Sequence, residues 1–181
     1  STEDQLIRSK AVERMEYWKN YREPTPPETI RQEPSYGDAS HGKKTDDADA
    51  HNKRGDAYYE AGKYQEAIKS YKQAIRIDPD YADAHYNLGE TYHASGRYEE
   101  AIESCKQAIE IDPDFKDAHV CLGNAYGELG RYEEAIESFK QAIEIDPDYA
   151  KAHRGLGLTY GMLGKYEEAI EAYKQAIEID P

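Results

Sequence analysis

Residues 84–114 read AHYNLGETYHASGRYEEAIESCKQAIEIDPD, and the pattern returns as AHVCLGNAYGELGRYEEAIESFKQAIEIDPD at 118–148 and as AHRGLGLTYGMLGKYEEAIEAYKQAIEIDP at 152–181. A looser copy, AHNKRGDAYYEAGKYQEAIKSYKQAIRIDPD, occupies residues 50–80. The copies follow one another every 34 residues. A repeat of this length holds one supersecondary unit that cannot bury its apolar face alone, so we expect neighbouring copies to stack into a solenoid with a continuous core.

Each copy predicts two helices joined by a turn. In the second copy, Ala84 and Leu88 belong to a first apolar set with helical spacing, and Gly96 follows where glycine is favoured, just past a helix C-terminus. A second apolar set begins at Tyr98 and is predicted to end before Asp112, because the proline that follows disfavours the helical region for the preceding residue. The predicted fold class is therefore all-α, built from helical hairpins.

Small residues recur in phase inside these helices. Glycine inside a helix costs about 1 kcal/mol relative to alanine, so a glycine that returns in every copy predicts a close approach between helices. These positions are Gly55, Gly89, Gly123 and Gly157 in the first helices, and Ala67, Ala74, Ala101, Ala108, Ala135, Ala142, Ala169 and Ala176 in the second helices.

On these Gly, Tyr, Ala and Pro positions, residues Ala48–Pro181 resemble the tetratricopeptide repeat (TPR) family, in four repeats at 48–81, 82–115, 116–149 and 150–181. The resemblance implies a right-handed α-solenoid of helix-turn-helix repeats. It also implies that the first helices line a concave groove for an extended peptide or a partner helix. The function predicted from the resemblance is a non-catalytic protein–protein interaction scaffold.

The same resemblance places the groove lining at the second, fifth, ninth, twelfth and thirteenth residues of each repeat. The groove candidates are Asp49, Asn52, Asp56, Tyr59, Asp83, Tyr86, Glu90, His93, Asn124, Lys151, Arg154 and Leu158. The first two repeats supply an acidic and aromatic set, and the last two supply an apolar set with a basic entrance. Some family members grip the carboxylate of chaperone tails with Lys, Asn and Arg side chains. Neither frame of matching places keeps this clamp, so such a ligand is not expected; the frame that starts at the first repeat holds Asn52, Asp56, Asn87, Asp117 and Cys121, and the frame that starts one repeat later holds Tyr86, Glu90, Cys121, Lys151 and Gly155.

The chain is acidic, with 37 acidic and 23 basic residues, a formal charge of -14 and a mean hydropathy of -1.00, and no apolar run long enough to cross a membrane. From Asp47 onward there are 28 acidic and 15 basic residues, so the acidity belongs to the repeats. Such a field repels nucleic acid and anionic lipid surfaces and favours a protein or peptide partner with a basic segment. Alternatively, the glutamates serve only solubility. These features leave the cellular compartment undetermined.

No catalytic constellation is recognisable, and we predict no enzyme, no cofactor and no metal site. Four histidines stand one repeat apart: His51, His85, His119 and His153. Helices pack at roughly 8–10 Å, which keeps several such side chains from reaching the ~2.1 Å that zinc requires. Packed imidazoles between hairpins are predicted instead. Cys105 and Cys121 fall at apolar positions and are expected to be buried, unpaired thiols, with a disulfide as the alternative.

Residues 1–22 read as an amphipathic helix, and residues 23–47 as a Pro- and Gly-rich linker arm. The fourth repeat keeps the apolar positions of an internal helix up to Pro181, whereas terminal repeats normally need a polar outer face. The alternative function is therefore a structural subunit that assembles head-to-tail into a homo-oligomer or filament, because heterologous contacts generate open chains. The candidate assembly or capping residues are Leu6, Ile7, Met15, Trp18, Tyr173 and Ile177.

Overall fold

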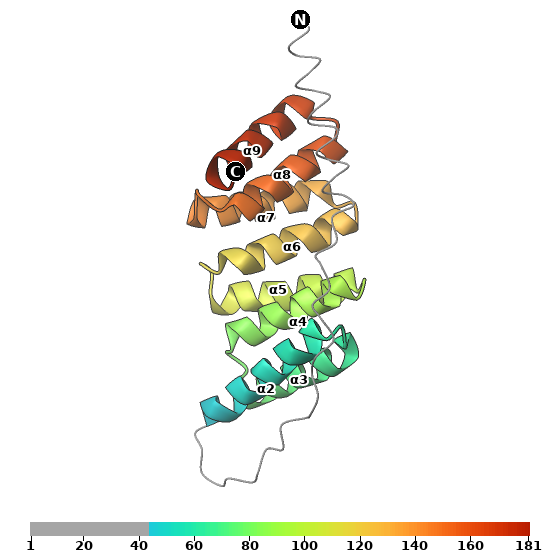
Figure 1. The fold of residues 1–181 in the computed structure, drawn as a ribbon, viewed down its shortest axis with the longest axis vertical. Helices are drawn as coiled ribbons and strands as arrows, with labels where there is room; N and C mark the ends of the chain where they lie inside the picture. Colours follow the sequence, from blue (N-terminus) through green and yellow to red (C-terminus); the bar gives the residue numbers. More distant parts are fainter. Residues whose placement is uncertain (1–43) are drawn as a thin grey trace, which may run out of the picture. The chain divides into compact units, whose positions relative to one another are not determined.

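The computed structural model describes residues 44–181 (Figure 1). The predicted helix at 1–22, the linker up to residue 43 and the candidates Leu6, Ile7, Met15 and Trp18 lie outside the described residues. The described helices are α2 (Lys44–Glu60), α3 (Tyr64–Ile77), α4 (Ala82–Ala94), α5 (Tyr98–Ile111), α6 (Lys116–Glu128), α7 (Tyr132–Ile145), α8 (Ala150–Met162) and α9 (Tyr166–Ile179). No strand occurs in this part of the chain, which confirms the all-α fold class. Within the same residues, no helix combines the length and apolarity needed to span a membrane.

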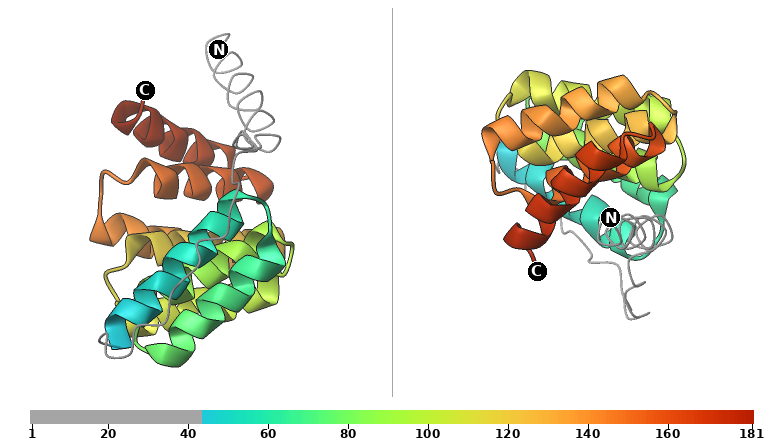
Figure 2. Two further views of the ribbon diagram at one scale, coloured as in Figure 1. Left: turned by 60° about the horizontal axis from the view of Figure 1, so that its bottom comes forward. Right: turned by 90° about the horizontal axis from the view of Figure 1, so that it is seen from above.

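The described chain forms two compact units, residues 44–113 (the N-terminal unit) and Asp114–Pro181 (the C-terminal unit). In the N-terminal unit, α2 packs on α3, α4 packs on α5, and the two hairpins meet through α3 and α4. In the C-terminal unit, α6 packs on α7, α8 packs on α9, and the hairpins meet through α7 and α8 (Figure 2). The first helices of the hairpins also touch within each unit, α2 against α4 and α6 against α8. Both units therefore use one packing scheme, as the sequence repeat predicts.

Each first helix is followed by a glycine with a left-handed backbone. The φ angles are 70° at Gly62, 76° at Gly96, 72° at Gly130 and 73° at Gly164. After α4, the N–H of Gly96 donates to the His93 carbonyl at 3.0 Å, and the N–H of Arg97 donates to the Tyr92 carbonyl at 2.9 Å. These paired bonds close a Schellman turn, in which a side chain at the glycine would be strained. The position predicted for Gly96 is confirmed.

Each second helix ends at an Asp-Pro pair. Asp112 has an extended backbone, with φ -128° and ψ 95°, as its proline neighbour predicts. Two histidines form hydrogen bonds with the turns between hairpins. His85 Nε2 lies 3.0 Å from the Pro79 carbonyl oxygen, and His153 Nε2 lies 2.8 Å from the Pro147 carbonyl oxygen. The repeat spacing of these two imidazoles thus reflects a repeated turn contact.

Aromatic rings of the second helices pack directly on glycines of the first helices. A Cβ atom added at Gly55 would lie 2.6 Å from Tyr71 Cδ1, and one added at Gly123 would lie 2.8 Å from Phe139 Cζ. Real Cβ atoms essentially never come closer than 3.0 Å to such neighbours. The predicted close approach of helices is therefore confirmed at these positions.

The two cysteines of the chain, Cys105 and Cys121, are both buried and both disulfide-bonded. Their burial was predicted from their apolar positions in the repeat and is confirmed. The prediction of unpaired thiols is wrong, because placement among apolar side chains does not separate a buried thiol from a buried disulfide sulfur.

Candidate functional site

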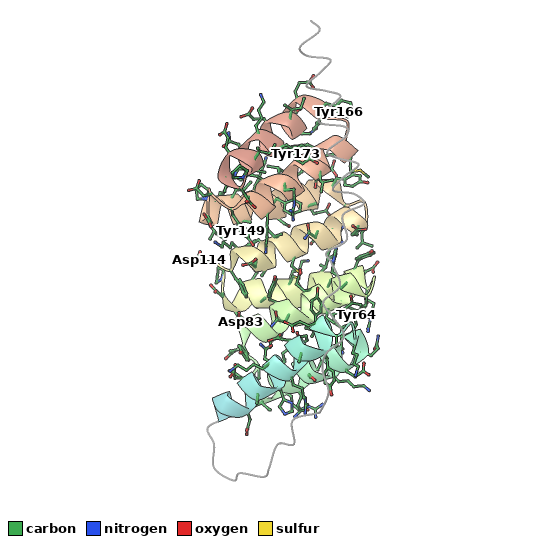
Figure 3. All side chains as sticks on the ribbon, viewed as in Figure 1. Tyr64, Asp83, Asp114, Tyr149, Tyr166 and Tyr173 are labelled. Carbon is green, nitrogen blue, oxygen red and sulfur yellow. The ribbon has the colours of Figure 1, made fainter. Side chains whose placement is uncertain are left out.

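The candidate site of the N-terminal unit lies on the first helices of its two hairpins, α2 and α4, which touch each other. These helices carry eight of the groove candidates. They are Asp49, Asn52, Asp56 and Tyr59 on α2, and Asp83, Tyr86, Glu90 and His93 on α4, with Asp83 labelled in Figure 3. We call this set the acidic face.

A hydrogen-bond network centred on Asp56 joins three helices. Asp56 Oδ1 accepts a hydrogen bond from the Tyr71 hydroxyl of α3 at 2.8 Å and another from the Asn87 amide of α4 at 3.2 Å. The same amide nitrogen donates to Asn52 Oδ1 at 3.3 Å. The network therefore fixes the Asp56 carboxyl group between the hairpins of this unit.

A cavity of about 160 Å³ lies beside this network. Its walls include the rings of Tyr59, Tyr71 and Tyr86 and the polar groups of Asp56, Glu60, Asn87 and Glu90. Aromatic faces attract cations through the ring quadrupole, and neighbouring carboxylates add full negative charges. The arrangement suits a cationic side chain. The groove candidates that it brings together are Asp56, Tyr59, Tyr86 and Glu90.

Negative charge accumulates around Asp56. Burial raises the pKa of its carboxyl group; the Tyr71 hydrogen bond opposes this rise, and the carboxylates of Glu60, Asp49 and Asp83 add to it. Asp49 has a cationic neighbour, because the Lys53 ammonium lies 2.7 Å from its Oδ2, and this hydrogen bond lowers the pKa of Asp49. On the acidic face, Asp49 is therefore paired with a cation, whereas Asp56 is surrounded by carboxylates.

Tyr81, just before α4, forms a hydrogen bond with Asp49 of the acidic face. Its hydroxyl donates to Asp49 Oδ1 at 3.3 Å, which ties the start of the second hairpin to α2. Burial is the main cause that raises the pKa of this hydroxyl to about 12, with the Asp49 carboxylate adding to the effect. Tyr81 therefore stays protonated and donates its hydrogen bond throughout the neutral range.

In the C-terminal unit, a cluster around Tyr149, labelled in Figure 3, contains the groove candidate Lys151. The Tyr149 hydroxyl donates to the Asp117 carboxylate, and Lys151 Nζ lies 3.7 Å from Asp117 Oδ1. The ammonium groups of Lys116 and Lys151 lie 4.7 Å and 5.9 Å from the centre of the Tyr149 ring. Lys116 also donates to Asp146 Oδ2 at 2.5 Å. A carboxylate, that of Asp117, therefore lies beside Lys151, one of the two basic residues of the predicted entrance.

The remaining candidates of the C-terminal unit are half-buried. They are Asn124 on α6 and Arg154 and Leu158 on α8. At the end of α8, the large apolar residue Met162 is 51% exposed. The two units thus differ in chemistry on corresponding helices.

Tyr173, labelled in Figure 3, is buried and does not face outward as an assembly residue would. It is 6% exposed, and a Cβ atom at Gly157 would lie 3.0 Å from its Cδ1 atom, so its ring packs inside the α8–α9 hairpin. Burial raises the pKa of its hydroxyl to about 12. From the apolar pattern of α9, Tyr173 was predicted to lie on the outer face, but α8, the other helix of its hairpin, covers it. Ile177, at 37% exposed, remains the outward candidate on this helix.

Tyr71 and Asn87 belong to the cavity although the groove candidates did not include them. Tyr71 was missed because it lies on a second helix, whereas the carried-over positions lie on first helices. A comparison of the four copies would have indicated the Asp56–Tyr71 contact. The pairs at this place are Asp56 with Tyr71, Glu90 with Cys105, Asn124 with Phe139 and Leu158 with Tyr173. Only the first pair joins a carboxylate to a hydroxyl donor.

The repeated hairpins and their glycine-aromatic contacts define a helical-repeat protein. A TPR family model matches residues 55–96 and 123–164, and tetratricopeptide repeat models match 82–115, 150–181 and 104–137. The chain belongs to the tetratricopeptide repeat family. This is a family of protein–protein interaction scaffolds that are generally non-catalytic.

Solved structures of the same fold support this assignment. A crystal structure of MamA shares 30% identity at a TM-score of 0.69, covering 74% of this chain and 78% of that chain. A thermophilic TPR protein of Thermus thermophilus shares 26% identity at a TM-score of 0.68, covering 74% of each chain. The second TPR domain of human RPAP3, in complex with the HSP70 peptide SGPTIEEVD, shares 29% identity at a TM-score of 0.63, covering 65% of this chain and 98% of that chain. A comparison with curated proteins finds no match to this chain.

Proposed function

We propose that this protein is a non-catalytic scaffold that binds an extended peptide segment with basic side chains on its acidic face. The observation that carries the proposal is the cavity of about 160 Å³ between α2 and α4, in which three tyrosine rings meet three carboxyl groups. Asp56 supports it further, because burial and, to a smaller extent, repulsion by the surrounding carboxylates raise the pKa of its carboxyl group. A cation in the cavity would relieve that repulsion.

The charge of the acidic face separates this ligand from the one in the RPAP3 structure. The HSP70 peptide bound there, SGPTIEEVD, carries acidic residues near its end. Asp56 and Glu90 would repel such a segment, because like charges that are partly removed from water destabilise each other. The same repulsion disfavours nucleic acid and anionic lipid surfaces. A segment rich in lysine or arginine has the complementary charge.

The test compares two probes on the intact chain. They are fluorescein-labelled nonapeptides, one of alternating alanine and lysine and one of alternating alanine and glutamate, followed by fluorescence polarisation. We expect only the lysine peptide to bind, with an affinity that falls as salt screens the charges. Asp56→Asn and Glu90→Gln should each weaken it, by a factor of about 2–5 for charge contacts of up to 1 kcal/mol. Equal binding of both peptides would refute the proposal.

The matched controls for this test lie on α5, away from the acidic face. Glu99→Gln and Glu103→Gln remove the same charge from exposed positions of the same unit. If the peptide responds to net charge alone, these variants will weaken binding as much as Asp56→Asn does. If it occupies the cavity, they will leave the affinity unchanged within error.

A second candidate function is assembly into homo-oligomers through α9, which the exposure of Ile177 and of Tyr166, at 50%, favours. Ile177→Glu would place a charge in that contact and disrupt it. Light scattering across a range of concentrations measures the effect, with Met162→Glu, an exposed apolar position on α8, as the control. Mass that grows with concentration in the parent chain and in Met162→Glu, but not in Ile177→Glu, would support assembly. A constant mass in all three would exclude it.

A further inference from the structure

A larger cavity, of about 470 Å³, lies in the C-terminal unit among α7, α8 and α9, on other helices than the acidic face. Its apolar lining consists of Ile143, Leu156, Tyr160 and Ala172. Its charged residues are Lys140, Glu144, Glu168 and Glu171, three carboxylates against one ammonium. The volume lies in the range of roughly 300–1,000 Å³ that is usual for pockets enclosing a ligand. We call it the α7–α9 cavity.

The corresponding place in the N-terminal unit is covered by cations. There Tyr92 corresponds to Tyr160, and the Arg97 guanidinium and the Lys72 ammonium lie 4.4 Å and 5.6 Å from the centre of its ring. Tyr92 is only 4% exposed. In the C-terminal unit, the Lys165 ammonium lies farther out, 5.9 Å from the Tyr160 ring, and Tyr160 is half-buried. Tyr160 therefore offers part of its ring to the cavity.

The exchange of arginine for lysine also affects the glutamate beside this ring. Arg97 donates from Nε to Glu100 Oε1 at 2.9 Å, and its Nη2 contacts the same oxygen. Lys165 stands at the corresponding position of the fourth repeat, three residues before Glu168. A lysine has a single nitrogen and cannot form this two-nitrogen contact. The Glu168 carboxylate instead lines the cavity.

We infer that the occupant of the α7–α9 cavity is the segment Tyr17–Arg22 of the same chain, which reads YWKNYR. The segment carries three aromatic rings, two cations and no acidic group. The rings match the apolar lining, and Lys19 and Arg22 match the excess of carboxylates. Trp18 has the largest apolar surface in the segment and enters the cavity, because aromatic side chains dominate the energy of such contacts.

The chain length between the segment and α2 favours docking within one molecule. Residues 23–43 can extend to about 70 Å, more than three times the length of a fourteen-residue helix, which is about 21 Å. A tether of this length presents its end at an effective concentration on the order of millimolar. At micromolar protein, a segment of the same chain therefore outcompetes that of a second copy.

Trp18 is the only tryptophan of the chain, so its fluorescence reports the docking directly. In the intact chain we expect blue-shifted emission and weak quenching by acrylamide. Glu168→Lys with Glu171→Lys, both at exposed positions, should lower the docking equilibrium about tenfold, equivalent to 1.4 kcal/mol. Trp18 should then be quenched nearly as strongly as in a free peptide of residues 11–22. The charge-matched control is Glu99→Lys with Glu103→Lys on α5, which should keep Trp18 protected.

Two results of this fluorescence experiment would overturn the inference. One is full quenching of Trp18 in the parent chain, which would show that the segment is undocked. The other is an equal loss of protection in both charge-reversal variants, which would show that the site is elsewhere or that net charge alone acts. Circular dichroism of each variant confirms that the helices remain intact.

Photo-cross-linking then locates the segment and identifies the molecule that it occupies. Benzoylphenylalanine replaces Trp18 in a mixture of nitrogen-14 and nitrogen-15 chains, and the adducts are read by mass spectrometry. Adducts to α7, α8 or α9 within chains of a single isotope support docking in the same molecule. Adducts of mixed isotope would assign the segment to a second copy, and adducts to the acidic face would assign it to the proposed peptide site. Either of these outcomes refutes the inference.

Discussion

Gly155→Ala on α8 tests how much the close approach of helices contributes to stability. A Cβ atom at Gly155 would lie 2.5 Å from Phe139 Cζ and 2.9 Å from Cδ1. The Phe139 side chain is only 2% exposed, and it also packs on Gly123, where a Cβ atom would lie 2.8 Å from the same Cζ atom. The ring is therefore held between the backbones of α6 and α8 and cannot retreat freely from either glycine.

The expected magnitude is the difference between two opposing effects. Overpacking of a core costs about 1–3 kcal/mol, and a distance of 2.5 Å puts Gly155→Ala at the upper end of that range. Replacing a helical glycine by alanine returns about 1 kcal/mol. We therefore expect Gly155→Ala to lower the free energy of unfolding by about 2 kcal/mol. Gly127→Ala on α6 is the control, because nothing lies within 4 Å of its Cβ position; it should raise the free energy of unfolding by about 1 kcal/mol.

Urea unfolding followed by far-UV circular dichroism measures both variants, which lie in the same unit. The double variant Gly155→Ala with Phe139→Leu adds a further check, since a smaller side chain relieves the contact. The combined loss should be smaller than the sum of the two single losses. If Gly155→Ala stabilises the protein as much as Gly127→Ala does, the packing argument is wrong.

Three further changes test individual contacts. Tyr149→Phe removes the hydroxyl that donates to Asp117 and should cost about 1–2 kcal/mol in urea unfolding, whereas Tyr166→Phe, at a residue 50% exposed, should change stability by less than about 0.5 kcal/mol. Asp56 has a raised pKa, so the affinity for the lysine peptide should fall when acidification protonates it; Asp56→Asn should flatten that dependence in polarisation titrations. Lys116 lowers the pKa of Asp146, so their pair stabilises the fold above the ordinary carboxyl pKa and loses this effect as pH falls through the lowered value. Lys116→Met should make the acid limb of stability shallower in urea titrations at decreasing pH.

The helical framework could be predicted because each of its determinants occurs in every copy. Gly96 marks a helix end through its left-handed backbone, and the Asp112-Pro113 pair marks another through a local steric effect. Both act within a few residues of the chain. Their consequences therefore do not depend on how the hairpins pack.

The cavity contacts could not be predicted in the same way because they depend on packing between helices. Tyr71 reaches Asp56 only because α3 packs against α2 over Gly55. The apolar pattern of α9, to which Tyr173 belongs, does not show which of its apolar positions α8 covers. Spacing along one helix shows that a side chain lies on the apolar face, but its burial also depends on the size of the residue opposite.

Asp56 has a structural role in the α2–α3 hairpin as well as its proposed role in binding, and this limits which substitution can test the proposal. Asp56 supplies part of the negative charge of the cavity, but its Oδ1 atom is also the acceptor for the Tyr71 hydroxyl. Alanine at position 56 would remove the charge and also leave the hydroxyl of Tyr71, a residue only 2% exposed, without that acceptor, a loss of about 1–3 kcal/mol. Asparagine removes the charge and keeps an oxygen acceptor at the same place. A binding defect in Asp56→Asn with unchanged urea unfolding can therefore be assigned to the charge, whereas the same defect in Asp56→Ala could equally come from a rearranged α2–α3 hairpin.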